Sequence, residues 1–339
     1  MRKELLWAGI IGISFGLIIG FGVWRVKSKI SQKNILAPSP TPQANLKGQL
    51  KIALNKPEDY SVTTESVITV SGITKSSSWV VASNETNDFI TKAGNDGTFL
   101  LDVDLKSGVN ILKVTSLNNQ SETSTEKVLV VYSPSFQTST PSPTSDSKSF
   151  EASSESDIDK AVALKVAQVG NNPKAYIGTV TDITDTTIQI KSMNSQIQQI
   201  ETGNNDVNVV DSKGTTTKIV KLTDIAIGDF IVAMGYVDGD EVLDVQRILI
   251  TNTLTETQIT TSIKKVVKEG TKSIEVIETD GSTQTITPGK NTEIYSYLEG
   301  KTTSIKLSSI TENEYVIVVS DTTGTPSITR SIFDIGQVN

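Results

Sequence analysis

The sequence contains no cysteine and no histidine among its 339 residues. Their absence excludes disulfides, thiol nucleophiles, zinc sites with the usual ligands, and every serine–histidine or cysteine–histidine catalytic arrangement. Each folded module must therefore be held together by its own apolar core rather than by covalent crosslinks. We expect a protein that is not an enzyme and that carries no cofactor and no metal.

Aromatic residues are scarce, at 5% of the chain, and charged residues make up only 20%. Serine, threonine, valine and isoleucine recur instead, which favours short β-strands joined by polar turns. We therefore expect a mainly β protein. A glycoside hydrolase needs only two carboxylates, so this class stays open, although the chain lacks the aromatic residues that such clefts use to hold sugars.

The beginning of the chain carries a net positive charge, whereas the rest is acidic. Residues 1–34 contain six basic residues and one acidic residue, so the total formal charge of −7 leaves −12 for the remainder. An acidic surface repels phosphate backbones instead of releasing their counterions. We therefore expect no nucleic-acid partner.

Only one long hydrophobic run is present, LLWAGIIGISFGLIIGFGV at residues 5–23. At a rise of about 1.5 Å per residue, a helix of this length spans the hydrocarbon core of a bilayer. The run is too long for a cleaved signal peptide and lacks a small-residue cleavage site after it. We predict a signal-anchor transmembrane helix with its flanks at residues 1–33. The protein would then cross the bacterial cytoplasmic membrane once, with most of the chain outside, although the basic residues after the run favour the opposite orientation.

Six of the ten prolines fall in two short tracts rich in serine and threonine. Such composition cannot bury a core and favours extended conformers. We predict a proline-rich linker at residues 34–48 and a Ser/Thr/Pro linker at 133–156. A short helix is expected at 157–170, because apolar residues recur there at helical spacing before Gly170.

Residues 49–132 contain seven short apolar runs separated by turn residues, a pattern that predicts a β-sandwich. The most specific segments are Lys56-Pro57-Glu58, Val70-x-Gly72, Asp96-Gly97-Thr98-Phe99 and Leu105-x-x-Gly108-x-Asn110-x-x-x-Val114. On these segments the module resembles the bacterial Ig-like domains of surface and secreted proteins. The resemblance implies a spacer or adhesion unit.

The remainder of the chain contains an internal repeat with an offset near 85 residues. TTTKIVKLTDI at 215–225 aligns with KTTSIKLSSI at 301–310, and IGDFIVAMG at 227–235 aligns with ENEYVIVVS at 312–320. An offset this long indicates tandem domains rather than solenoid units. We predict two small β-barrels that resemble the OB-fold, at residues 174–252 and 256–337. Their shared register should place Val232 and Ile317 at equivalent buried positions.

The first copy also resembles a family of bacterial envelope domains of unknown function. The resemblance rests on Gly178-Thr-Val-Thr-Asp-Ile, on Leu222-x-Asp224-Ile225-x-x-Gly228-Asp229 and on Val232-x-x-Gly235. The second copy has Asn313-Glu314 in place of Gly228-Asp229, so it is the more diverged member.

The densest acidic cluster, a weak candidate for a calcium site, comprises Asp238, Asp240, Glu241 and Asp244. Its spacing does not match an EF-hand loop, and Asp-Gly here favours a two-residue hairpin turn. Trp79 is a weak candidate for a sugar-stacking platform, although burial in the sandwich is the stronger expectation. Asn84-Glu-Thr86 matches a glycosylation acceptor, a pattern that is frequent by chance.

These features favour a membrane-anchored, extracytoplasmic structural, adhesion or spacer protein of a bacterial cell envelope. The alternative is a module that binds a polysaccharide or a peptide on one barrel face, as OB-like barrels bind oligomers. The expected partners are the membrane, through the N-terminal helix, and cell-wall polysaccharide or surface proteins. No feature of the sequence specifies which ligand is bound.

Overall fold

The computed structural model describes residues 50–136, 172–203, 207–214, 216–238, 240–278 and 281–337. The predicted anchor, the linker at 34–48, most of the second linker and the short helix lie outside these ranges. Within them, every regular element is a strand apart from two short 3-10 turns. No helix in the described ranges is long and apolar enough to cross a membrane. The described part of the chain is therefore mainly β, as the composition predicts.

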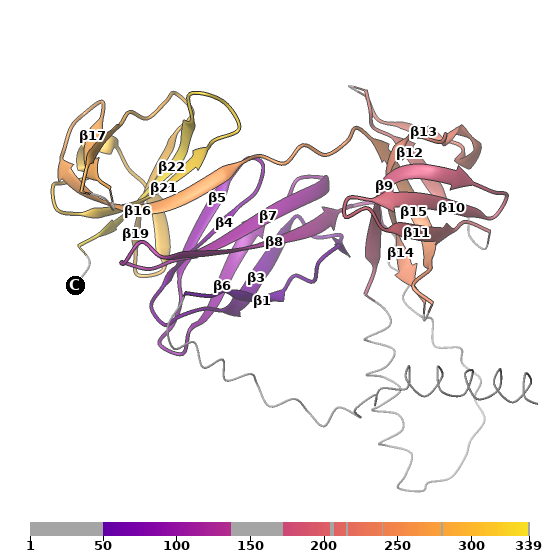
Figure 1. Ribbon diagram of the computed structural model, residues 1–339, viewed down its shortest axis with the longest axis horizontal. Coiled ribbons are helices and arrows are strands. Elements are labelled where there is room, and N and C mark those ends of the chain that lie inside the picture. The colour runs from indigo at the N-terminus through magenta and orange to yellow at the C-terminus, as the bar shows by residue number, and fades with distance from the viewer. Residues whose placement is uncertain are drawn as a thin grey trace, which may run out of the picture. The chain divides into compact units, whose positions relative to one another are not determined.

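The first module is a two-layered β-sandwich (Figure 1, indigo to magenta). One layer has the strand order β1-β3-β6, and the other contains the path β2-β8-β7-β4-β5. A core that includes Val70, Leu112 and Val130 fills the space between the layers. The strands are β1 (Ala53–Lys56), β2 (Ser61–Thr63), β3 (Val67–Ile73), β4 (Trp79–Ser83), β5 (Asp88–Lys92), β6 (Thr98–Asp104), β7 (Gly108–Leu117) and β8 (Thr123–Tyr132).

The next seven strands form what we call the first repeat, and the last seven form the second repeat. The first repeat contains β9 (Lys174–Ile183), β10 (Thr187–Ser192), β11 (Ile197–Glu201), β12 (Asn208–Asp211), β13 (Lys218–Val220), η1 (Leu222–Asp224), β14 (Phe230–Val237) and β15 (Leu243–Thr251). The second contains β16 (Ile259–Lys268), β17 (Ile274–Ile277), β18 (Thr283–Ile286), β19 (Glu293–Leu298), β20 (Lys301–Ser304), η2 (Leu307–Ser309), β21 (Tyr315–Asp321) and β22 (Ile328–Gly336).

The two repeats have the same strand order. The first reads β13-β12-β15-β14-β9-β10-β11, and the second reads β20-β19-β22-β21-β16-β17-β18. The only parallel pairing in the second, β19 with β22, matches β12 with β15 in the first. Val232 and Ile317 are both fully buried, which confirms the register predicted from the sequence.

Backbone contacts are conserved even where the residues differ. Gly228 and Asn313 both have a positive φ, of 95° and 73°, and asparagine is among the few residues that tolerate this conformation. Gly228 N donates to Val180 O at 2.9 Å, and Asn313 N donates to Val266 O at the same distance. The replacement of glycine by asparagine therefore leaves the turn intact.

The repeats differ in how the sheet closes. In the first, β11 pairs in parallel with β15 through Ile200 with Leu243 and Glu201 with Asp244, which completes a ring of strands. In the second, β18 pairs only with β17 among the described strands, so the corresponding ring is open.

Candidate functional site at the seams of the sandwich

The outer face of the larger sandwich sheet carries two groups of apolar side chains. One group, with Val62, Ile111 and Val131, packs against Ile177 and Val232 of the first repeat. We call this contact the first seam. The other group packs against the second repeat in the second seam, which contains Trp79, Val81, Ile90, Leu117, Ile263, Ile317 and Phe333. Each repeat therefore uses the same strand pair, β9 with β14 or β16 with β21, to cover the sandwich.

Trp79 lies inside the second seam. Trp79 is only 5% exposed, and its ring lies nearly perpendicular to that of Tyr297, with 5.1 Å between the centroids. The ammonium group of Lys92 lies 5.0 Å from the same ring. Trp79 therefore packs between modules, where its faces are covered by protein.

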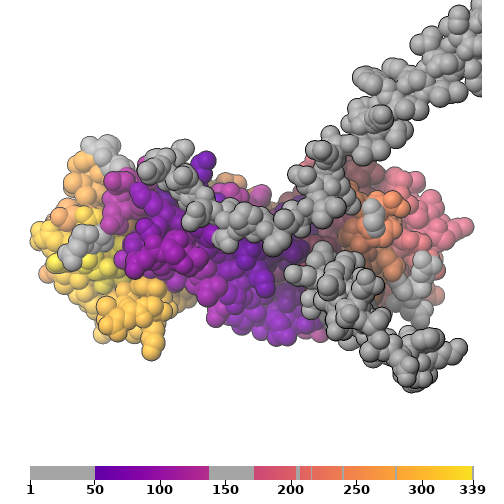
Figure 2. Space-filling model, turned by 90° about the horizontal axis from the view of Figure 1, so that it is seen from below, coloured from indigo at the N-terminus to yellow at the C-terminus, as the bar shows by residue number. Residues whose placement is uncertain are grey.

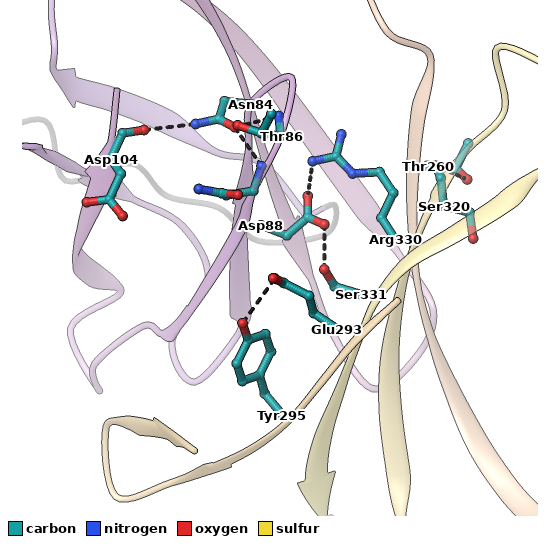
Figure 3. Close-up of polar contacts among 11 residues, drawn as sticks. Asn84, Thr86, Asp88, Asp104, Thr260, Glu293, Tyr295, Ser320, Arg330 and Ser331 are labelled. Carbon is teal, nitrogen blue, oxygen red and sulfur yellow. Dashed lines mark hydrogen bonds and ion pairs between the residues drawn. The ribbon is translucent and has the colours of Figure 1, made fainter. Parts of the chain in front are cut away.

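A buried polar contact joins the modules beside these apolar residues (Figure 3). Ser331 Oγ donates to Asp88 Oδ2 at 2.7 Å, and Arg330 forms an ion pair with Asp88 Oδ1 at 3.2 Å. Burial raises the pKa of Asp88, while Arg330, Ser331 and Ser83 partly oppose this effect and Glu293 adds to it. The carboxylate is thus held in the second seam by one cation and by hydroxyl donors.

The turn that carries Asp88 is held by Asn84. Asn84 Oδ1 accepts hydrogen bonds from the backbone N–H of Thr86 and of Asn87, at 2.9 and 2.7 Å. Its amide donates to the carbonyl oxygen of Asp104 at 2.8 Å (Figure 3). The Asn84 amide is buried and bonded to the protein itself. The Asn84-Glu-Thr86 pattern, which matches a glycosylation acceptor, therefore has a structural role in this turn.

A cleft of about 420 Å³ lies beside this contact. Its walls include four acidic residues, Asp88, Asp102, Asp104 and Glu293. Asp102 accepts a hydrogen bond from Thr69 Oγ1 at 2.7 Å, and Glu293 accepts one from Tyr295 at 3.0 Å. Among the described residues, no three acidic side chains are placed to hold a metal ion together. The cleft is therefore an acidic groove in which the carboxylates of Asp88, Asp102 and Glu293 have protein partners.

The acidic segment at Asp238 forms the connection between β14 and β15, but not as a two-residue turn. Asp238 N donates to Val242 O at 3.0 Å, Glu241 N donates to Asp238 O at 3.3 Å, and Glu241 has a φ of 60°. This is a three-residue loop that ends on a left-handed residue. Asp238 Oδ1 also accepts the N–H groups of Asp240 and Val242, both at 2.9 Å. Asp244 lies beyond the loop, in β15.

Sequence reasoning missed Asp88 and Arg330, because neither belongs to a recognisable motif. The available signal was weak: Arg330 is one of only two arginines beyond Arg25, the other being Arg247. An arginine inside an apolar strand commonly needs a carboxylate partner. The identity of that partner, more than 240 positions earlier in the chain, required the three-dimensional arrangement.

No family model matches this chain, and no curated protein matches it. Three solved structures cover similar shares of it. The first is described as "host cell surface retention of a 1.5-MDa bacterial ice-binding adhesin"; it has 12% identity and a TM-score of 0.18, with 85% of this chain and 96% of that chain covered. The second, a "Ca2+-stabilized adhesin" of an Antarctic bacterium, has 14% identity and a TM-score of 0.19, with 86% and 73% covered.

The third is dimeric latent PorU from Porphyromonas gingivalis, with 8% identity and a TM-score of 0.19, which covers 86% of this chain and 34% of that chain. All three TM-scores are too low to assign a fold. The functional argument therefore rests on the residues of this chain.

Proposed function

We propose that this chain is a membrane-anchored, non-catalytic structural or adhesion protein of a bacterial cell envelope, with its modules outside the cytoplasmic membrane. The observation that carries the proposal is the pair of seams. The sandwich uses one sheet face to bind both repeats, and each repeat uses the same strands to reach it. The two apolar clusters outside the individual cores thus join modules to one another.

This arrangement suits a spacer. Buried contacts such as Val232 in the first seam and Ile317 in the second resist separation, because exposing apolar surface costs roughly 25 cal/mol per Å². The Asp88–Arg330 pair adds directional specificity to the second seam. A protein that holds a surface at a fixed distance needs modules that stay joined under load.

The sequence supports the proposed location outside the cytoplasmic membrane. Residues 5–23 have the length and composition of a membrane-spanning helix, and two proline-rich tracts flank the sandwich. The repeats would then be OB-like barrels, and the sandwich an Ig-like module, displayed outside the membrane.

Protease added to intact cells tests the topology. We expect loss of an epitope tag placed at the C-terminus, with an N-terminal tag and a cytoplasmic marker protein left intact. Full protection of the C-terminal tag, even after any outer envelope is opened, would contradict the proposal and place the modules in the cytoplasm.

A further inference from the structure

The open ring of the second repeat has a polar interior at its open end. A groove of about 360 Å³ lies there, and its lining is almost entirely Ser, Thr, Gln and Lys. The hydroxyl-bearing residues that matter below are Ser262, Thr322, Ser327 and Thr329. No aromatic residue lines the groove.

Each of these four residues replaces an apolar side chain of the first repeat. The strand pairings place Tyr176 opposite Ala233 and Ser262 opposite Val318, at matching positions. Gly235 pairs with Val245 in the first repeat, and Ser320 at the matching position pairs with Thr329 in the second. Val245 and Thr329 therefore occupy matching positions. Val237 pairs with Leu243 in the first repeat, and by the same register these two residues match Thr322 and Ser327, which lie just beyond the paired ends of β21 and β22. In the first repeat these four apolar residues belong to the closed core or pack against it.

The same substitutions accompany the loss of closure. Val245 and Leu243 are fully buried in the first repeat, whereas Ser327 is exposed and Thr329 half-buried in the second. A core that has become hydrophilic at one end gains little from closing over itself. The second repeat therefore presents a groove where the first has a packed interior.

Strand β18 lies beside this groove, and some of its backbone N–H and C=O groups point away from its one partner strand, β17. Glu278 N donates to Ser282 O at the β17–β18 turn. Because hydrogen-bonded pairs alternate in antiparallel sheets, Gln284 and Ile286 bond to β17. The N–H and C=O groups of Thr283 and Thr285 then point away from β17, toward the side that β15 occupies in the first repeat.

This edge also lacks the usual protection against strand addition. The other edge strands of the three described sheets are β1, β5, β6, β13 and β20, and each contains a lysine or an aspartate. β18 has the sequence TQTI, with no charge. Charged side chains on an edge discourage pairing with another chain, so β18 is the edge in the described structure that is left available.

We propose that the second repeat binds an extended peptide segment of another protein, which pairs with β18 and directs small polar side chains into the groove. The hydroxyl lining suits serine, threonine or asparagine on the inward face of that segment. We expect the peptide to pair with β18 rather than with the opposite wall, where the Thr329 carbonyl oxygen already accepts a hydrogen bond from Thr292 Oγ1 at 2.7 Å. A free strand edge and a lining without aromatics favour peptide over sugar, which binds on aromatic platforms. This binding mode adds to the proposed envelope role and does not depend on the topology.

The test uses the full-length chain in detergent micelles as bait for a displayed library of random nine-residue peptides. We expect enrichment of peptides with small polar residues at alternate positions. The dissociation constant of an enriched peptide should rise about tenfold or more in Thr285→Pro, which removes the outward N–H. Thr285→Ala retains that N–H, so it should raise the dissociation constant by much less than Thr285→Pro does.

Proline is tolerated on edge strands, so Thr285→Pro should fold, and its circular dichroism spectrum and melting temperature serve as the check. The double variant Ser327→Leu with Thr329→Val restores the apolar residues of the first repeat and should also raise the dissociation constant about tenfold or more. Peptides that bind both variants as well as the wild type would overturn the proposal, as would a library that yields no enrichment. Binding of cell-wall oligosaccharides in the groove instead of peptides, or self-association of the chain that Thr285→Pro abolishes, would also overturn it.

Discussion

Asp88 shows how a single buried carboxylate links two modules and makes their contact sensitive to pH. Burial raises its pKa, so the folded chain holds this proton more tightly than the unfolded chain does. The associated stability is present at low pH and is lost as the pH rises through the folded-state pKa. Glu58, whose pKa is lowered by the hydrogen bond and charge of Lys174, acts in the opposite direction, with stability lost as the pH falls.

Substitution of Asp88 by asparagine isolates this contribution. We expect the unfolding free energy of Asp88→Asn, measured by urea denaturation, to improve relative to the wild type as the pH rises from about 4 to about 7. The comparison removes the effect of Glu58 and other carboxylates, because both proteins retain them. Parallel pH profiles would mean that the pKa of Asp88 is not raised in the folded chain.

Asp238 and Asp240 are neighbours in one loop but have different roles. Asp238 Oδ1 accepts two backbone hydrogen bonds across the turn, so Asp238→Ala should lower the unfolding free energy by about 1 kcal/mol. Asp240→Ala should change it by less than about 0.5 kcal/mol, as is usual for exposed positions.

Calcium tests the same loop independently. A site of millimolar affinity would add roughly 2.7 kcal/mol of stability in about 100 mM calcium. We expect no change in melting temperature from calcium. A rise that disappears in Asp240→Ala would instead identify the loop as a calcium site.

At the level of elements, neighbouring strands approach two glycines closely in the first repeat, the repeat whose ring of strands is closed. A Cβ atom at Gly235 would lie 2.0 Å from the Asp244 carbonyl oxygen, and one at Gly178 would lie 2.3 Å from that of Lys191. The second repeat has Ser320 and Lys264 at the matching positions. Glycines of this kind permit the sharp bends by which barrels close.

Gly235→Ser should therefore destabilise the first repeat. We expect a loss of about 1–3 kcal/mol in unfolding free energy, the usual cost of inserting atoms into a filled space. Ser320→Gly, the reverse change in the open repeat, serves as the matched control and should cost less. An equal effect of the two substitutions would show that closure does not depend on this glycine.

Local patterns predicted most of these elements and few of their contacts. The apolar runs predicted seven strands in the sandwich; the structure adds β2, which has only three residues and so too short a pattern to recognise. The alignment of the repeats correctly placed Val232 and Ile317 because strand alternation is local. It could not indicate that both side chains face the sandwich rather than the interior of their own repeat.

The same limit applies to the candidate sites. Turn-forming residues identified the hairpin at Asp238, but the length of the loop depended on the left-handed conformation of Glu241. The seams and the polar groove depend on pairings between distant strands, which composition does not encode. Comparison of the two repeats within one structure was needed to recognise Ser327 and Thr329 as replacements of core residues.

For the whole molecule, the two seams predict cooperative unfolding of the sandwich with its repeats. Ile317 is fully buried in the second seam, and an aspartate there would place an unpaired charge in an apolar contact, at a cost of several kcal/mol. We expect scanning calorimetry of the full-length chain to give one main transition for the wild type. The same measurement should give two transitions for Ile317→Asp, because the second repeat is then uncoupled from the sandwich.

Ile219→Asp is the matched control, since Ile219 is 81% exposed and its substitution should leave the single transition unchanged. Separate transitions in the wild type itself would show that the seams are too weak to couple the modules. The modules would then unfold independently, which contradicts the role of a rigid spacer.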